Sequence, residues 1–188
     1  MTENSLQFLV ALDHIEPRIW RRIQVPDNYS LGQLHQVIQI VVGWHDSHLH
    51  EFQFKGNRYG EIDPESEEGV LDEYNVRLRD LKLSVGERID YCYDFGDNWQ
   101  HQVVLEEILA PVPKAVSPTC LSGERRCPPE DVGGVDGYAD FLEAIGDPEH
   151  EDHDAMLTWA GENFNPEAFS VTEVNQSLRR RLRPAKKR

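Results

Sequence analysis

The sequence lacks long apolar runs and contains few cysteines. No apolar segment approaches the roughly 20 residues that a helix needs to cross a bilayer. The first residues, MTENSLQFLVALDH, have neither the basic region nor the small-residue cleavage site of a secretory signal. Three cysteines are an odd number, and nothing else suggests a disulfide framework. We therefore expect a cytoplasmic protein with no membrane partner, whose thiols are free or bind metal.

Positive charge is also scarce, and much of it lies at one end. The chain has 19 Lys and Arg against 34 Asp and Glu, a net charge of −15. Seven of the 19 lie in residues 179–188, which leaves 12 against 34, or −22, for the rest. So acidic a body repels phosphate backbones, and only the basic tail offers nucleic acid a contact. A solvated, frayed end is the alternative interpretation of that tail.

The 188 residues, 39% of them hydrophobic, are enough for one domain with a core. LQFLVALDH and RIWRRIQV predict two strands, and HLHEFQF predicts a third. Between the second and the third of these strands, Ser30 and Gln33 form a capping box for a helix that ends near Gly43. This order predicts an α+β fold with a mostly antiparallel sheet and a β-hairpin–helix–strand, β-grasp-like core.

A proline-rich segment, APVPKAVSPT, is expected to lead from the sheet to a helical C-terminal part. Helix starts are predicted at Asp136, at Asp147-Pro148 and at the second capping box of Ser170 and Glu173. We therefore divide the chain into an α+β sheet core (1–110), a helical subdomain with cysteines and histidines packed on it (111–176), and a basic tail (177–188).

The segment YCYDFGDNWQH, residues 91–101, predicts a β-hairpin. A three-residue loop of Gly96, Asp97 and Asn98 gives the register that places the most aromatic rings on one face of the hairpin, where they can be buried. Asparagine tolerates the left-handed backbone conformation that such a loop needs. This register places Asp94 and His101 on opposite faces of the hairpin, which disfavours a catalytic pair. A loop shorter by one residue would place the two residues directly across from each other on the same face. The side chains expected on the apolar face are Tyr91, Tyr93, Phe95, Trp99, His101, Val103 and Leu105.

Two groups of residues are candidates for metal binding. Cys120, Cys127, His150 and His153 could form a Cys2His2 structural zinc site, with the histidines three apart on one helix; buried free cysteines are the alternative. His48 and His50 lie two apart on a predicted strand and share a face, as in some metal sites. Because Phe52 and Phe54 share that face, we favour the interpretation that the two histidines lie at the rim of the core. No cofactor is certain, and structural zinc is the one we consider.

Several long segments make the chain resemble the plasmid pRiA4b ORF-3-like family, whose members also carry a transposon-passenger, resolvase-like TnpR label. These segments are PRIWRRIQVP, GWHDSHLHEFQF, YCYDFGDNWQHQVVLEE, CPPEDVGGVDGYADFLEAI and WAGENFNPEAFSVTEVN. The resemblance covers nearly the whole chain. It implies a compact α+β fold and, through the label alone, a link to mobile elements.

The sequence contains no complete catalytic constellation. The leading hypothesis is therefore a non-enzymatic binding or adaptor module for an unknown protein or small ligand. Its groove would be lined by Trp44, Tyr91, Tyr93, Trp99 and His101.

An enzyme is the alternative hypothesis. A metal-dependent hydrolase or nuclease would use His48, His50 and His101 with Asp94 or Asp97 as ligands or acid/base groups. A resolvase-like recombinase needs a nucleophilic serine backed by arginines. No serine is tied by motif to the arginines at 18, 21 and 22, and the acidic body disfavours DNA.

Overall fold

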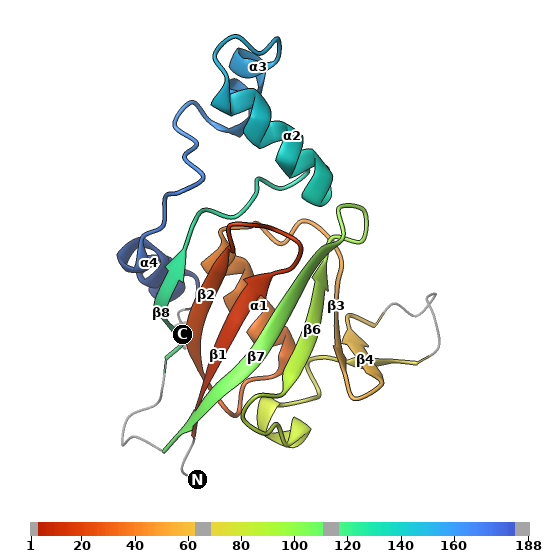
Figure 1. Cartoon of the computed structure of the whole chain (residues 1–188). Helices are drawn as coiled ribbons and strands as arrows, with labels where there is room; N and C mark the ends of the chain where they lie inside the picture. Colours follow the sequence, from red (N-terminus) through yellow and green to blue (C-terminus); the bar gives the residue numbers. More distant parts are fainter. Residues whose placement is uncertain (1–3, 63–68, 111–116, 183–188) are drawn as a thin grey trace, which may run out of the picture.

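The computed structural model describes residues 4–62, 69–110 and 117–182, and these residues form one large sheet with helices around it (Figure 1). The strand order is β5-β4-β3-β6-β7-β1-β2-β8. All neighbouring strands are antiparallel except β4 and β5, which are parallel. The predicted α+β class with a mostly antiparallel sheet and a helical C-terminal part is confirmed. The elements are β1 (Ser5–Leu12), β2 (Trp20–Pro26), α1 (Leu31–Val42), β3 (His50–Phe54), β4 (Asn57–Gly60), β5 (Val70–Asp72), the 3-10 helix η1 (Leu78–Leu81), β6 (Arg88–Tyr93), β7 (Trp99–Leu109), β8 (Thr119–Glu124), α2 (Gly134–Gly146), α3 (His153–Ala160) and α4 (Val171–Arg181).

Helix α1 covers one face of the sheet and carries much of the core (Figure 1). The predicted capping box is present, since Ser30 Oγ accepts from Gln33 N and Gln33 Oε1 accepts from Ser30 N. Gly43 ends the helix in the left-handed conformation, as expected. The apolar side chains of α1 pack on the sheet, and His35 and Gln39 are buried among them. Two polar side chains therefore lie inside this core.

The β6–β7 hairpin has the predicted faces but a different turn. Tyr93 pairs with Trp99 and Tyr91 with His101, so the turn spans five residues and not three. A shift of two residues keeps every side chain on its face, because strand side chains alternate with period 2. The predicted place of Phe95 is wrong: it lies in the turn and is 55% exposed. Asn98 takes the left-handed conformation that we predicted for it.

The C-terminal part begins with a strand. β8 lies inside the segment predicted to be helical and pairs with β2 at the sheet edge. α4 packs on β8 and α1, whereas α2 and α3 lie together beyond one end of the strands (Figure 1). α3 begins at His153, so the predicted start at Pro148 is wrong. Turns closed by His150 N to Asp147 O and by His153 N to His150 O occupy the segment between.

Of the helices in the described ranges, none combines the length and the apolar character that spanning a bilayer requires. The proposed division at residue 110 stays a prediction. Most of the basic tail, residues 183–188, lies outside the described residues.

Candidate metal centre

Two buried histidines stack at the interface between α1 and the sheet. The imidazole rings of His35 in α1 and His50 in β3 have centroids 3.4 Å apart and planes within 4° of parallel. His35 Nε2 lies 2.7 Å from Asp46 Oδ1, and His50 Nε2 lies 2.8 Å from Glu73 Oε2. Ligand atoms of His35, Asp46 and His50 all lie within 4.8 Å of one another. Glu73 adds a second carboxylate through its contact with His50, and the Asp46 side chain is 46% exposed whereas those of the other three are buried. We call these four residues the buried centre.

Each member of the buried centre comes from a different element. His35 lies in the second turn of α1, and His50 is the first residue of β3. Asp46 lies in the α1–β3 loop with a positive φ of 61°, a conformation that aspartate tolerates better than most residues. Glu73 follows β5, and its backbone is fixed because its N–H donates to Gly60 O while its carbonyl accepts from Gly32 N. The site therefore depends on the tertiary fold.

A glycine in α1 makes room for the buried carboxylate. A Cβ at Gly32 would lie 2.8 Å from Glu73 Oε1 and 2.6 Å from a ring carbon of Tyr74. Glu73 is fully buried, and its Oε1 has no hydrogen-bond partner. A buried carboxylate oxygen without a partner is costly, by about 1–3 kcal/mol or more. A cation at this point would satisfy it.

A second layer of hydrogen bonds holds the ligands. Tyr91 Oη lies 2.8 Å from His35 Nδ1 and accepts from Gln39 Nε2 at 3.1 Å. Gln39 Oε1 accepts from the backbone N–H of Asp46 at 3.1 Å. The Tyr91–Gln39 pair therefore fixes the ring of His35 and the loop that carries Asp46. Supporting contacts of this kind orient histidine and carboxylate ligands in metal sites.

The electrostatics of the buried centre favour a neutral imidazole at His35. Burial, and then the neighbouring His50, lower the pKa of His35 to about 4, so its imidazole is neutral at pH 7. Metal ions bind the neutral imidazole. Burial raises the pKa of Tyr91 well above its ordinary value, which keeps its hydroxyl protonated.

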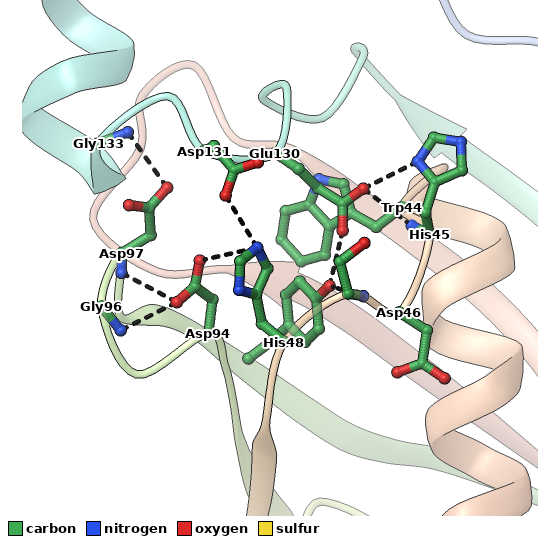
Figure 2. A network of polar contacts seen from close by, with 12 residues as sticks. Trp44, His45, Asp46, His48, Asp94, Gly96, Asp97, Glu130, Asp131 and Gly133 are labelled. Carbon is green, nitrogen blue, oxygen red and sulfur yellow. Dashed lines mark hydrogen bonds and ion pairs between the residues drawn. The ribbon is translucent and has the colours of Figure 1, made fainter.

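A second polar cluster lies beside the buried centre and is shown in Figure 2. His48 Nε2 lies 2.8 Å from Asp131 Oδ1 and 3.6 Å from Asp94 Oδ2, and we call these three residues the open cluster. Nearby, Glu130 accepts from Tyr93 Oη at 2.6 Å and from the backbone N–H of His45 at 3.0 Å. Asp46, on the same loop as His48, points away from it toward α1 (Figure 2).

The aromatic residues predicted to line a groove form a core. All five are at most 2% exposed, and their rings contact one another; they are Trp44, Tyr91, Tyr93, Trp99 and His101. Of these residues, Trp44 borders a cleft of about 1030 Å³. The structure therefore does not place these rings around a common groove.

The four predicted zinc ligands do not come together, since no group of metal-ligating atoms in the described ranges includes any of them. Cys127 Sγ accepts from Arg21 Nη2 at 3.4 Å, and Cys120 Sγ lies 3.6 Å from Ser122 O. Burial raises the pKa of both thiols. His153 Nδ1 lies 2.9 Å from Ala144 O, and His150 lies outside the helix expected to align the two histidines. The structure thus does not group the four residues of the predicted Cys2His2 site.

The residues of the alternative metal site, His48, His50 and Asp94, are divided between the open cluster and the buried centre. β3 begins at His50, so His48 lies in the preceding loop and the two histidines do not share a strand face. His48 lies near Asp94, and His50 joins the buried centre. His101 belongs to neither group, because its Nδ1 lies 2.9 Å from Trp99 O.

Sequence reasoning missed three residues of these clusters, His35, Asp46 and Glu73. It considered Asp131 only beside Glu130, as a pair of carboxylates that could hold a cation, and did not connect it with His48. The clearest available signal was His35, a polar residue within the apolar stripe of α1. Glu73 gave no signal, because it follows an acidic loop and looks like a solvated residue.

Comparisons with known proteins agree with the fold. The profile of the plasmid pRiA4b ORF-3-like protein family matches residues 4–173. The uncharacterized protein y4hQ of Sinorhizobium fredii is 37% identical over 180 residues, which are 95% of this chain and 92% of that protein. The crystal structure of a protein of unknown function, MM3350, from Methanosarcina mazei has a TM-score of 0.84 and 37% identity, covering 92% of this chain and 98% of that one. The chain therefore belongs to the plasmid pRiA4b ORF-3-like family.

Proposed function

We propose that this protein binds one divalent transition-metal ion at the buried centre of His35, Asp46, His50 and Glu73. The observation that carries the proposal is that ligand atoms of His35, Asp46 and His50 lie within 4.8 Å of one another, and that His50 also contacts the fully buried Glu73, whose Oε1 has no hydrogen-bond partner. Two carboxylates also balance the charge of a divalent ion, which removes the penalty for burying negative charge.

The donor set indicates the class of ion. Imidazole nitrogen and carboxylate oxygen together suit zinc and its neighbours in the first transition row, whereas magnesium and calcium prefer oxygen alone. Four protein ligands complete a tetrahedral zinc site, which is the pattern of closed, structural centres. We therefore propose a binding protein in which the ion joins α1, β3 and the loops that carry Asp46 and Glu73. A role in mobile elements and a cytoplasmic location stay predictions from the sequence.

Elemental analysis of the purified protein after reconstitution with zinc tests this function. We expect about one tightly held zinc per chain, lost in His35→Gln and in His50→Gln. His45→Ala is the matched control, because this histidine lies next to Asp46 in the sequence, contacts Glu130 and belongs to neither cluster. The proposal fails if both variants retain the tightly held ion.

A further inference from the structure

We propose that the open cluster of His48, Asp94 and Asp131 is a second cation site, which takes a divalent ion of the zinc class and ties the β6–β7 turn to the segment before α2. The proposal rests on its own observations and does not need an ion at the buried centre. Ligand atoms of the three residues lie within 4.8 Å of one another. They come from the α1–β3 loop, the β6–β7 turn and the segment 128–133 (Figure 2).

The imidazole nitrogen at the centre of the cluster has no hydrogen-bond partner. His48 Nε2 is out of contact with solvent, and although Asp131 Oδ1 is 2.8 Å away, neither carboxylate completes a hydrogen bond with it. Its contacts with the two carboxylates are ion-pair contacts without the geometry of a hydrogen bond. A cation bound to this nitrogen and to both carboxylates would give all three groups a bonded partner.

Asp94 is held in place for this role. It is only 8% exposed and has a positive φ of 57°, a left-handed conformation that aspartate tolerates better than most residues. Its Oδ1 accepts from Gly96 N at 2.9 Å and from Asp97 N at 3.3 Å, which leaves Oδ2 facing His48 Nε2. The turn therefore aims one carboxylate oxygen at the histidine.

The open cluster is more accessible to solvent than the buried centre. Its Asp131 side chain is 68% exposed, so an ion here would keep positions for water beside three protein ligands. Three ligands and solvent access predict weaker, exchangeable binding. The ion would also reinforce the contact between Asp97 Oδ2 and Gly133 N, at the start of α2.

Calorimetric titration of the metal-free protein with Zn²⁺ tests the proposal. We expect a second, weaker binding step. His48→Gln and Asp131→Asn should each lower the zinc affinity of this step at least tenfold, and His45→Ala should leave that affinity unchanged. Asp131 is exposed, so its variant does not endanger folding. Hydrogen exchange of residues 128–137 should slow at zinc concentrations that fill this step.

The variants separate the two sites. Loss of the weak step in Asp131→Asn and of the tight step in His50→Gln supports two independent sites. A titration with no weak step, or a weak step that both Asp131→Asn and His48→Gln retain, overturns the second site whatever happens at the buried centre.

Discussion

His48 and His50 are two residues apart, yet they end in very different surroundings. The side chain of His50 is 4% exposed and faces the fully buried Glu73, whereas that of His48 is 31% exposed and faces the exposed Asp131. The residue types are the same in both places, an imidazole beside carboxylates. Burial makes the difference: the uncompensated charge of Glu73 would be costly, whereas water can solvate the exposed carboxylate of Asp131.

Removing the histidine beside Glu73 has the largest expected effect. In His50→Ala the buried carboxylate loses its partner, which costs about 3–5 kcal/mol for a buried pair broken on one side. We expect a large drop in the midpoint of thermal unfolding, together with loss of the tightly held zinc. Calorimetry and elemental analysis measure the two effects, and His48→Ala, at the open cluster, is the comparison. A similar drop in both variants would contradict the contrast between the sites.

Filling the space at Gly32 should have a smaller effect on stability and a clear one on metal binding. In Gly32→Ala the new methyl group contacts Glu73 Oε1 and Tyr74, and overpacking of this kind costs about 1–3 kcal/mol. Zinc affinity at the buried centre should fall because the carboxylate must move. Gly146→Ala is the control, since a Cβ there meets nothing within 4 Å. Unchanged zinc affinity in Gly32→Ala would weaken the assignment of Glu73 as a ligand.

The core histidine His101 should make stability depend on pH. Burial lowers its pKa to about 4, so the folded state disfavours the proton that the unfolded state binds below its ordinary pKa of 6.5. Stability is therefore full above pH 6.5 and falls as the pH decreases toward 4, by about 3 kcal/mol in all for this residue. Urea unfolding between pH 4 and 7 measures the slope, which His101→Leu should reduce. An unchanged slope in the variant would show that other groups cause it.

The smallest effect is expected at the exposed end of the open cluster. Without metal, Asp131→Asn should change the free energy of unfolding by less than about 1 kcal/mol, because exposed ion pairs contribute little. With zinc added, the wild-type protein should gain stability at the weaker binding step and the variant should not. Thermal unfolding over a range of zinc concentrations measures both quantities. Equal zinc stabilisation in the two proteins would count against the second site.

Local patterns in the sequence predicted much of the fold. Alternation placed Tyr91, Tyr93, Trp99 and His101 on a buried face, and the Ser30 capping box marked the start of α1. Alternation could not give the turn length, because a shift of two residues preserves every face. Phe95 was therefore misplaced.

The candidate sites could not be predicted in the same way. His35, His50 and Glu73 meet only after α1 and the segment following β5 pack against the sheet, and no spacing in the sequence records that contact. The Cys2His2 interpretation relied on His150 and His153 sharing a helix, but α3 begins only at His153. Of the open cluster, the sequence suggested His48 and Asp94 but had no means of bringing Asp131 to them.

The most direct test of the buried centre is anomalous diffraction at the zinc edge from crystals grown with zinc. We predict a strong peak between His35 Nε2, His50 Nε2 and the carboxylates of Asp46 and Glu73, within about 2.0–2.2 Å of each ligand atom. Density that shows His50 Nε2 hydrogen-bonded directly to Glu73, with no peak between them in excess zinc, would contradict the proposal.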